Sequence, residues 1–381
     1  MKTLGQFSVE HFLEHYWQQK PVVLRQVFPR FEDLLTPEEL AGMSLESDVE
    51  SRLIQYQSEN SQWHLNTGPL SESIYSSLPE NHWTLLVQTI DEWLPEAHEL
   101  LEHFNFIPNW RRDDLMVSYA TPGGGVGPHV DQYDVFLVQG LGSRRWKVGS
   151  PNQKVTPSFP HPQLKQIADF DPIIDETLER GDVLYIPPNT PHDGVAVEAC
   201  MTYSVGFRAP SHHMIYEQLL DDILSEEEFS SPRFKDVSPN RAFKTQALPS
   251  QLMDWLRASL ASISDEALIQ AFGKLVTEPR YENEPFEDSL GRAFKNIGNR
   301  PFTLQIDPQA RVTYTECNQQ FFLFINGESV LFSTRYQPIL KKLCEYEQIH
   351  GKDLNNCLQD IEFVNEIANL IDKGWIIFIQ M

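Results

Sequence analysis

Between residues 114 and 209 the chain is a series of short β-forming runs separated by glycines and prolines. Strands of this length, bounded by turn residues and with no helices between them, are typical of antiparallel sandwiches and barrels. The runs with this character are Leu115–Ala120, Tyr133–Gln139, Arg144–Val148, Asp182–Ile186, Gly194–Val197 and Met201–Phe207. The sequence therefore predicts an all-β barrel or sandwich as the central element of the fold.

The last of these predicted strands has two faces of different chemistry. Side chains alternate across a strand, so every second residue shares a face. One face is apolar and the other small and polar: Tyr203, Val205 and Phe207, against Thr202, Ser204 and Gly206. This pattern is typical of a barrel wall that holds a ligand.

The residues before the barrel mix helical patterns with short extended segments. A helical stripe of apolar residues is formed by Phe12, Leu13, Tyr16 and Trp17. The extended KPVVL of residues 20–24 follows it. A capping box with proline at the first helical position, residues 36–39, predicts a helix that begins there.

Beyond residue 210 the pattern becomes helical again. Apolar spacing predicts one helix from Ser250 to Phe272, preceded by a loop from Ser225 to Pro249. From residue 301 the pattern predicts a separate small α/β unit. Its features are a hairpin turning at Asn326-Gly327, two helices marked by Ile339/Leu343 and Ile361/Val364/Ile371, and a strand over Trp375–Ile379.

Residues 121–146, TPGGGVGPHVDQYDVFLVQGLGSRRW, contain a His-x-Asp motif at His129 and Asp131. In a strand these two side chains point to the same face, so an imidazole and a carboxylate can reach a common metal ion. His192, in DVLYIPPNTPHDG, lies just before another predicted strand. Two histidines and one carboxylate form the facial triad of non-haem Fe(II) oxygenases, which leaves coordination positions open for dioxygen and a cosubstrate.

The spacing of this motif is by itself a weak signal. About one His-x-Asp is expected by chance in a chain of this length with 12 histidines. Its context strengthens the prediction, because glycines at 123–125 and 127 allow a tight approach and Pro187-Pro188 stiffen the segment before His192. A pair of structural histidines and a barrel without metal remain the alternative interpretations.

Arg144 and Arg145 lie on the next predicted strand, where alternation sends them to opposite faces. An arginine that points into a barrel is costly to bury without an anion. A dicarboxylate would supply one, because the guanidinium fork binds carboxylates with two parallel hydrogen bonds. The alternative is a surface arginine beside Trp146.

The sequence resembles the JmjC-domain 2-oxoglutarate oxygenases, and among them the bacterial ribosomal oxygenases. The matching segments are WQQKPVVLR (17–25), PGGGVGPHVDQYDVFLVQG (122–140), RRW (144–146), GDVLYIPP (181–188), PH (191–192) and YSVGFRAP (203–210). The resemblance implies an α+β fold in three parts. These are a double-stranded β-helix of the JmjC or cupin-like jelly-roll type over 1–210 with its barrel core at about 114–209, a helical dimerisation region over 211–300, and a winged-helix-like domain over 301–381.

By the same resemblance, His129, Asp131 and His192 match the residues that bind iron in the family. Arg144 matches the basic residue that holds the far carboxylate of 2-oxoglutarate. Two positions depart from relatives: Ala120 aligns with a serine that often assists this carboxylate, and Thr202 aligns with an asparagine in the last barrel strand.

The implied activity is hydroxylation of an arginine side-chain carbon in a basic protein of the large ribosomal subunit. Fe(II) is the implied cofactor, 2-oxoglutarate and O2 are the cosubstrates, and succinate and CO2 are the co-products. We hypothesise that Gln132, Tyr133 and Asp134, beside the metal ligands, meet the protein substrate, although barrel packing would equally explain them. The rival functions are a JmjC histidine hydroxylase, a JmjC lysine demethylase, and a ligand sensor without turnover.

The charge balance of the chain favours basic partners. It carries 30 basic and 54 acidic residues, a net charge of −24. Such a field repels phosphate backbones, so we expect no nucleic-acid partner and interpret the winged-helix-like end as a scaffold for dimerisation or substrate docking. The apolar stripes of the helical middle region predict a homodimer, although folding back onto the same chain would also bury them.

The four cysteines lie far apart, which disfavours a disulfide framework or a zinc ribbon. The first residues lack the apolar core of a signal peptide, and no apolar run approaches the roughly 20 residues that span a bilayer. We therefore expect a cytoplasmic protein without a membrane partner.

Overall fold

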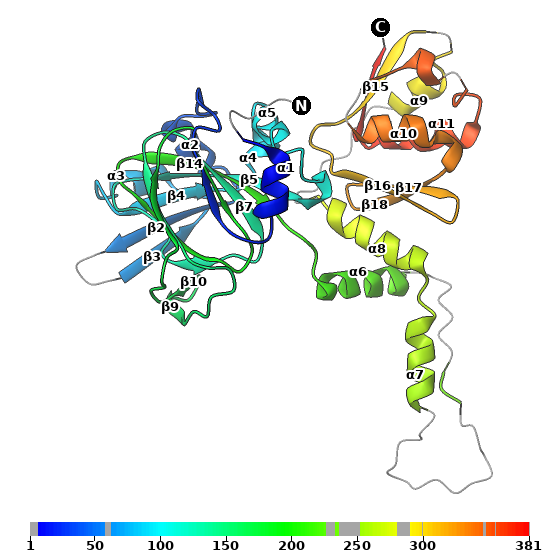
Figure 1. Cartoon of the computed structure of the whole chain (residues 1–381). Helices are drawn as coiled ribbons and strands as arrows, with labels where there is room; N and C mark the ends of the chain where they lie inside the picture. Colours follow the sequence, from blue (N-terminus) through cyan, green and yellow to red (C-terminus); the bar gives the residue numbers. More distant parts are fainter. Residues whose placement is uncertain are drawn as a thin grey trace, which may run out of the picture. The chain divides into compact units, whose positions relative to one another are not determined.

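The structure is a computed structural model. It describes residues 7–57, 62–225, 233–235, 252–279, 290–298, 300–345, 348–354 and 356–380. The chain divides into two compact units, Met1–Ala209 and Pro210–Met381 (Figure 1). Each is described by itself.

The first unit is built on two antiparallel sheets. The larger sheet has the strand order β1-β12-β7-β14-β5-β4-β2-β3. Its strands are β1 (Val22–Leu24), β2 (Ser51–Gln57), β3 (Gln62–Thr67), β4 (Trp83–Val87), β5 (Arg112–Ala120), β7 (Asp134–Gln139), β12 (Val183–Ile186) and β14 (Cys200–Phe207). The smaller sheet has the order β11-β8-β13-β6-β10-β9. Its strands are β6 (His129–Val130), β8 (Arg144–Val148), β9 (Pro157–His161), β10 (Leu164–Ile167), β11 (Ile174–Leu178) and β13 (Pro191–Ala196).

This arrangement confirms the predicted antiparallel barrel or sandwich and corrects one detail of it. His192 lies inside β13 rather than just before a strand, because β13 begins at Pro191. The sheets also contain strands outside the six predicted runs. β9 has the sequence PSFPH, whose two prolines cannot donate ladder hydrogen bonds, and it lies at the edge of its sheet, where proline is tolerated.

Short helices precede and follow the first strands of this unit. They are α1 (Val9–His15), α2 (Pro37–Met43), α3 (Glu72–Ser76), α4 (Ile90–Trp93), α5 (Ala97–Glu102) and the 3₁₀ turn η1 (Asn109–Arg111). The capping box is confirmed, since the Thr36 side chain accepts from the Glu39 backbone and the Glu39 side chain accepts from the Thr36 backbone. α1 ends at His15, so Tyr16 and Trp17 pack on the core from the following turn.

β14 has the two faces that its sequence predicts. Tyr203, Val205 and Phe207 are buried in the main apolar core of the unit. The residues between them, Thr202, Ser204 and Gly206, line a pocket. One strand therefore joins the hydrophobic core to the cavity wall.

The second unit begins with helices. These are α6 (His212–Ser225), α7 (Leu252–Ala261), α8 (Asp265–Thr277) and α9 (Leu290–Lys295). The single helix predicted over Ser250–Phe272 is wrong: Ser264 accepts a hydrogen bond from the Ala267 amide and starts a new helix, so α7 and α8 are separate. The predicted loop Ser225–Pro249 lies mostly outside the described residues.

The rest of the second unit contains two three-stranded sheets and two helices. The sheets have the orders β19-β15-β20 and β16-β17-β18. The elements are β15 (Phe302–Ile306), β16 (Val312–Cys317), β17 (Gln320–Ile325), β18 (Glu328–Ser333), η2 (Thr334–Tyr336), α10 (Gln337–Cys344), β19 (Ile349–His350), η3 (Gly351–Leu354), α11 (Ile361–Asp372) and β20 (Ile376–Gln380).

The predicted hairpin and helices of this part are confirmed. Asn326 and Gly327 have φ values of 45° and 79°, the positive angles that a type I′ turn needs at both central residues. α8 packs against the β16–β18 sheet, where a Cβ on Gly273 would lie 2.4 Å from the Phe324 ring. The helices and the C-terminal strands thus belong to one compact unit, and the predicted division at residue 300 stays a prediction. Within the described residues, no helix has the length and apolar character needed to cross a membrane.

Candidate metal centre and its pocket

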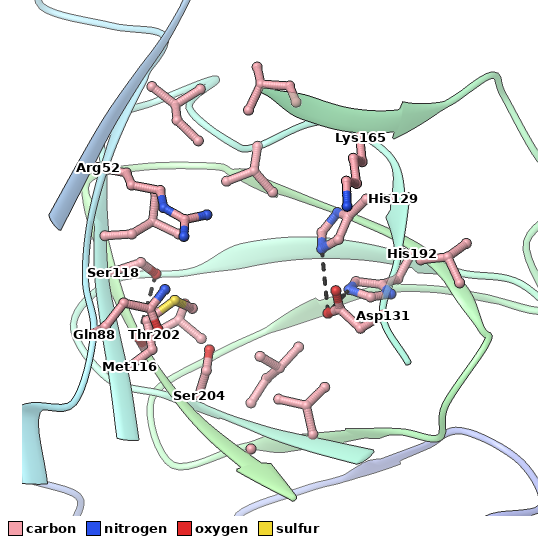
Figure 2. Close-up of a pocket in the computed structure, with 18 of the residues that line it drawn as sticks. Arg52, Gln88, Met116, Ser118, His129, Asp131, Lys165, His192, Thr202 and Ser204 are labelled. Carbon is pink, nitrogen blue, oxygen red and sulfur yellow. Dashed lines mark hydrogen bonds and ion pairs between the residues drawn. The ribbon is translucent and has the colours of Figure 1, made fainter. Parts of the chain in front are cut away.

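Strand register brings the two predicted histidine ligands together. The Cα atoms of His129 in β6 and His192 in β13 are direct cross-strand partners. Asp131 follows β6 immediately, and one ligand atom from each of the three residues lies within 4.8 Å of the other two. Figure 2 shows the three side chains gathered on one side of the pocket. Two imidazoles and one carboxylate in this arrangement can hold a metal ion.

Backbone carbonyls fix the orientation of both imidazoles. Nδ1 of His129 lies 2.9 Å from the Gly127 carbonyl oxygen, and Nδ1 of His192 lies 2.9 Å from the Thr190 carbonyl oxygen. Since each Nδ1–H donates to a carbonyl, each imidazole in its neutral form carries its free lone pair on Nε2, the atom that a metal ion would bind. These two Nε2 atoms lie 3.7 Å and 3.5 Å from Oδ2 of Asp131. Orientation of ligand histidines by such carbonyls is typical of protein metal sites.

The electrostatics favour a neutral His129 and an ionised Asp131, the forms that bind a metal ion. Burial and the nearby His192 lower the pKa of His129 to about 4. Burial would raise the pKa of Asp131, but the neighbouring histidines outweigh it and hold that pKa well below its usual range. Burial alone would lower the pKa of His192. The hydrogen bond to Asp131 has the opposite effect and outweighs burial, so the pKa of His192 is raised overall. At neutral pH the site therefore presents an ionised carboxylate beside at least one neutral imidazole.

The approach to β6 requires glycine at position 127. Gly127 has a φ of +79°, and a Cβ there would lie 2.2 Å from Nε2 of Gln166. The Gln166 side chain, from β10, donates to the Val126 carbonyl at 2.6 Å. This packing holds the turn whose Gly127 carbonyl orients His129.

Arg144 and Arg145 face opposite sides of β8, as alternation predicts. Arg145 lies at the surface and binds Asp175 through two hydrogen bonds of 2.6 and 2.7 Å. Arg144 is 4% exposed and lines the pocket. It donates to Oγ of Ser118 at 3.3 Å and to the Gly194 carbonyl at 3.1 Å.

No carboxylate of the described residues forms an ion pair with Arg144, and its Nε has no hydrogen-bond partner there. Burial lowers the pKa of Arg144. The nearby Asp193 opposes this lowering only in part. A buried guanidinium without a directly paired carboxylate is costly, and the surrounding pocket offers room for an anion. The predicted preference of Arg144 for a carboxylate ligand thus agrees with its surroundings.

Ser118 and Ala120 lie on the same face of β5 but have different surroundings. Ala120 packs with Ala196 and Cys200 in a small apolar cluster. Two residues earlier on the same face of β5, Ser118 lines the pocket and contacts Arg144. Ser118 is thus the serine of β5 that contacts Arg144, and the alignment of Ala120 with the serine of relatives stays a prediction. Thr202 lines the pocket as well, and its hydroxyl donates to Gln139 at 3.4 Å.

The three hypothesised substrate-contact residues have different positions. Tyr133 lines the pocket, and Gln132 is exposed outside its lining. Asp134 is fully buried and accepts hydrogen bonds from Tyr185 (2.6 Å), Arg111 (2.9 Å) and Gln18 (3.1 Å). The structure thus places Asp134 among core partners and outside the pocket.

The pocket has a volume of about 420 Å³ and contains residues that the sequence did not single out. Among them are Arg52 from β2, Leu65 from β3, Gln88 directly after β4, Asp114 and Met116 from β5, and Lys165 and Gln166 from β10. Figure 2 shows Met116, Ser118 and Thr202 across the cavity from the metal ligands. Alternation along β5 could have revealed Asp114, which shares a face with Ser118, but the predicted strand began at Leu115, three residues after the observed start at Arg112.

Comparison with known proteins places this site in a family. The JmjC domain family matches residues 99–215, and the ROXA-like winged-helix family matches residues 251–376. The ribosomal protein uL16 3-hydroxylase of Escherichia coli (strain K12) is 37% identical over 386 residues, which cover 96% of this chain and 96% of that protein. The chain belongs to the JmjC ribosomal oxygenases.

Two further relatives agree with this assignment. A probable ribosomal oxygenase of Haemophilus influenzae is 34% identical to this oxygenase, over 96% of this chain and 95% of the relative. A solved structure of a ribosomal oxygenase from E. coli, in complex with cobalt and 2-oxoglutarate, superposes with a TM-score of 0.82 at 34% identity. The superposition covers 98% of each chain. The winged-helix match confirms the predicted character of the C-terminal part.

Proposed function

We propose that this JmjC ribosomal oxygenase is a 2-oxoglutarate- and Fe(II)-dependent hydroxylase of ribosomal protein uL16. It adds a hydroxyl group to an arginine side-chain carbon, with succinate and CO2 as co-products. One observation carries the proposal: a single pocket contains a two-histidine, one-carboxylate cluster and a buried arginine whose Nε has no hydrogen-bond partner among the described residues. Family membership joins this geometry to uL16, the protein named for the E. coli relative.

His129, Asp131 and His192 would hold the iron. Their donor set is that of non-haem Fe(II) oxygenases, and the carbonyls of Gly127 and Thr190 already orient both imidazoles. The bound metal would supply the activation of dioxygen that is coupled to decarboxylation of 2-oxoglutarate. The cobalt-bound relative supports a metal in this fold.

Arg144 and Ser118 would hold the far carboxylate of 2-oxoglutarate. The guanidinium is buried and fixed by the Gly194 carbonyl, so its charge and its fork geometry are available to an anion. Ser118 contacts the same guanidinium at 3.3 Å and can share the carboxylate. The carboxylate in turn supplies the counter-ion that burial of Arg144 requires.

An acidic side chain in the pocket favours a basic substrate residue. Apart from Asp131, Asp114 is the only carboxylate among the described residues that line this pocket. It accepts a weak hydrogen bond from the Thr89 amide at 3.3 Å. A guanidinium binds a carboxylate with charge-assisted hydrogen bonds, whereas a neutral imidazole would gain less from it. The net charge of −24 would also attract a basic protein.

We also propose that the chain forms a homodimer through its helical region. α6 and α7 each expose a row of large apolar side chains at three- or four-residue spacing: Tyr216, Leu220 and Leu224 on α6, and Met253, Leu256 and Leu260 on α7. Leu224 and Leu260 are 75% and 71% exposed. Exposed apolar surfaces of this kind commonly mark protein interfaces.

The proposed location is the cytoplasm, where newly made ribosomal proteins would be available.

The test is a reconstituted reaction with recombinant uL16 from the same organism. The protein, Fe(II), 2-oxoglutarate and oxygen are incubated with uL16, and the products are analysed by intact and tandem mass spectrometry. We expect a gain of one oxygen on one arginine, with one succinate formed per hydroxyl group. The His129→Ala variant should give no product. An oxygen on a histidine, or loss of a methyl group from lysine, would favour one of the rival JmjC activities instead.

A further inference from the structure

We infer that Trp146 provides a third donor for the dicarboxylate cosubstrate, through its indole N–H beside Arg144. This inference rests on the proposed function, because it assumes that the pocket binds 2-oxoglutarate. It adds a positioning residue to the metal triad and the Arg144–Ser118 pair.

The register of β8 and β13 places Trp146 between the two ends of the site. The inward-facing cross-strand pairs run in order: His192 with Val148, Gly194 with Trp146, and Ala196 with Arg144. The metal ligand is thus at one end of this row and the arginine at the other. A ligand that extends from the metal ligands to Arg144 must pass over the middle pair.

The middle pair is shaped around the indole. A Cβ on Gly194 would lie 2.6 Å from the six-membered ring of Trp146, so any larger residue there would displace the indole. The atoms that approach Gly194 are Cε3, Cζ3 and Cη2, on the edge away from the N–H. The N–H edge of the ring therefore faces away from the β13 backbone.

The indole contacts both functional ends of the site. The guanidinium carbon of Arg144 lies 5.0 Å from the Trp146 ring centroid, within the range of a cation–π contact. The ring centroid of His192 lies 6.2 Å from that of Trp146. Movement of this one ring would therefore disturb the arginine and the metal ligand together.

Two buried donors of this pocket lack hydrogen-bond partners among the described residues. They are Nε1 of Trp146 and Nε of Arg144, and both residues line the pocket and are at most 5% exposed. Leaving a buried N–H unsatisfied is unfavourable, whereas a carboxylate oxygen can accept from both groups. We assign this acceptor to the far carboxylate of 2-oxoglutarate, because that carboxylate is the group proposed to bind Arg144, and the indole lies beside Arg144. If Trp146 served only for packing, the fit of its ring over Gly194 would be explained, but its buried indole N–H would have no hydrogen-bond partner among the described residues.

The experiment measures binding of 2-oxoglutarate and of succinate to the Mn(II)-loaded protein by calorimetry, without turnover. Trp146→Phe keeps an aromatic ring over Gly194 and removes the N–H. We expect both ligands to bind about tenfold more weakly, because one charge-assisted hydrogen bond is lost. Mn(II) affinity and the melting temperature should stay close to those of the wild type. Trp83→Phe is the matched control, since its indole donates to the Pro79 carbonyl outside the pocket and its loss should leave both affinities unchanged.

Unchanged affinities in Trp146→Phe would overturn the inference, and so would a loss that affects 2-oxoglutarate but spares succinate. A wild-type protein that binds neither ligand would instead refute the proposed function. If Trp146→Phe does not fold, NMR of the indole N–H groups in ¹⁵N-labelled, Zn(II)-loaded wild type tests the inference instead. One of the eight tryptophan signals should move downfield when 2-oxoglutarate is added, and no movement would overturn the inference.

Discussion

The imidazole centroids of His129 and His192 lie 4.1 Å apart because the two residues are cross-strand partners in neighbouring antiparallel strands. β6 contains only two residues. It pairs with β13 on one side and with Gln166 of β10 on the other, and these partners fix its position. Metal ligands on paired strands keep their spacing through backbone hydrogen bonds and need little reorganisation. The spacing of the two histidines is thus a property of the sheet.

Arg144 should control the affinity for 2-oxoglutarate. Arg144→Lys keeps the charge but loses the fork, and we expect the KM for 2-oxoglutarate to rise about tenfold. Arg144→Met removes the charge and should raise it about 100-fold. Steady-state kinetics at saturating uL16 measure both values. Arg145→Met is the control, because Arg145 lies on the outer face of the same strand and should leave KM unchanged.

Asp114 should control the affinity for the protein substrate. Asp114→Asn removes a charge from the pocket while nearly keeping the shape of the side chain. We expect the KM for uL16 to rise about tenfold, because a charge-assisted hydrogen bond to the target guanidinium becomes a neutral one. The affinity for 2-oxoglutarate, measured by calorimetry, should not change. An unchanged KM for uL16 would show that the arginine is recognised elsewhere.

Asp182 should stabilise the first unit in a pH-dependent manner. Its carboxylate accepts from the amides of Gln26 and Glu179 and pairs with Arg25 at 2.7 Å. Burial raises the pKa of Asp182, but these partners outweigh burial and lower it overall. Because the pKa is lower in the folded state than in the unfolded chain, the contribution is present at neutral pH and is lost as the pH falls below about 5.

We therefore expect Asp182→Asn to lower the free energy of unfolding by about 2 kcal/mol at pH 7. The difference from wild type should shrink as the pH approaches 3. Urea denaturation at several pH values measures it. Asp175→Asn, in an exposed pair with Arg145, should lower the free energy of unfolding much less, because solvent screens that pair. A pH-independent difference for Asp182→Asn would contradict the assignment.

Leu224 should contribute to the proposed dimer. A glutamate in place of this exposed leucine would have to be desolvated in an apolar interface, so Leu224→Glu should convert dimers to monomers at micromolar concentration. Light scattering coupled to size-exclusion chromatography measures the mass. Glu217→Gln, on the same helix, serves as a conservative control. A monomeric wild type would refute the dimer and leave the hydroxylase proposal intact.

Short sequence patterns predicted those features of the fold that depend on interactions between residues close together in the chain. The alternation along β14 predicted which residues face the core and which face the pocket, and the capping box predicted the start of α2. The His-x-Asp spacing and the alternation at Arg144 likewise predicted side chains that meet in one pocket. These features depend on residues close in sequence.

Features that depend on strand pairing were not predictable in the same way. Arg52 and Lys165 reach the pocket from β2 and β10, whose register with the other strands no local pattern reveals. The contact between Ser118 and Arg144 was not predictable either, because β5 and β8 belong to different sheets whose approach no local pattern reveals. The break between α7 and α8 depends on a cap at Ser264, which a continuous apolar stripe concealed.

The most direct test of the account is the mass of uL16 purified from ribosomes of the native host. Cells with the wild-type gene should yield uL16 that carries one additional oxygen on an arginine. Cells in which the gene is deleted, or replaced by the His129→Ala variant, should yield uL16 without it. A hydroxylated uL16 in the deletion strain, or an unmodified one in the wild type, would contradict the central claim.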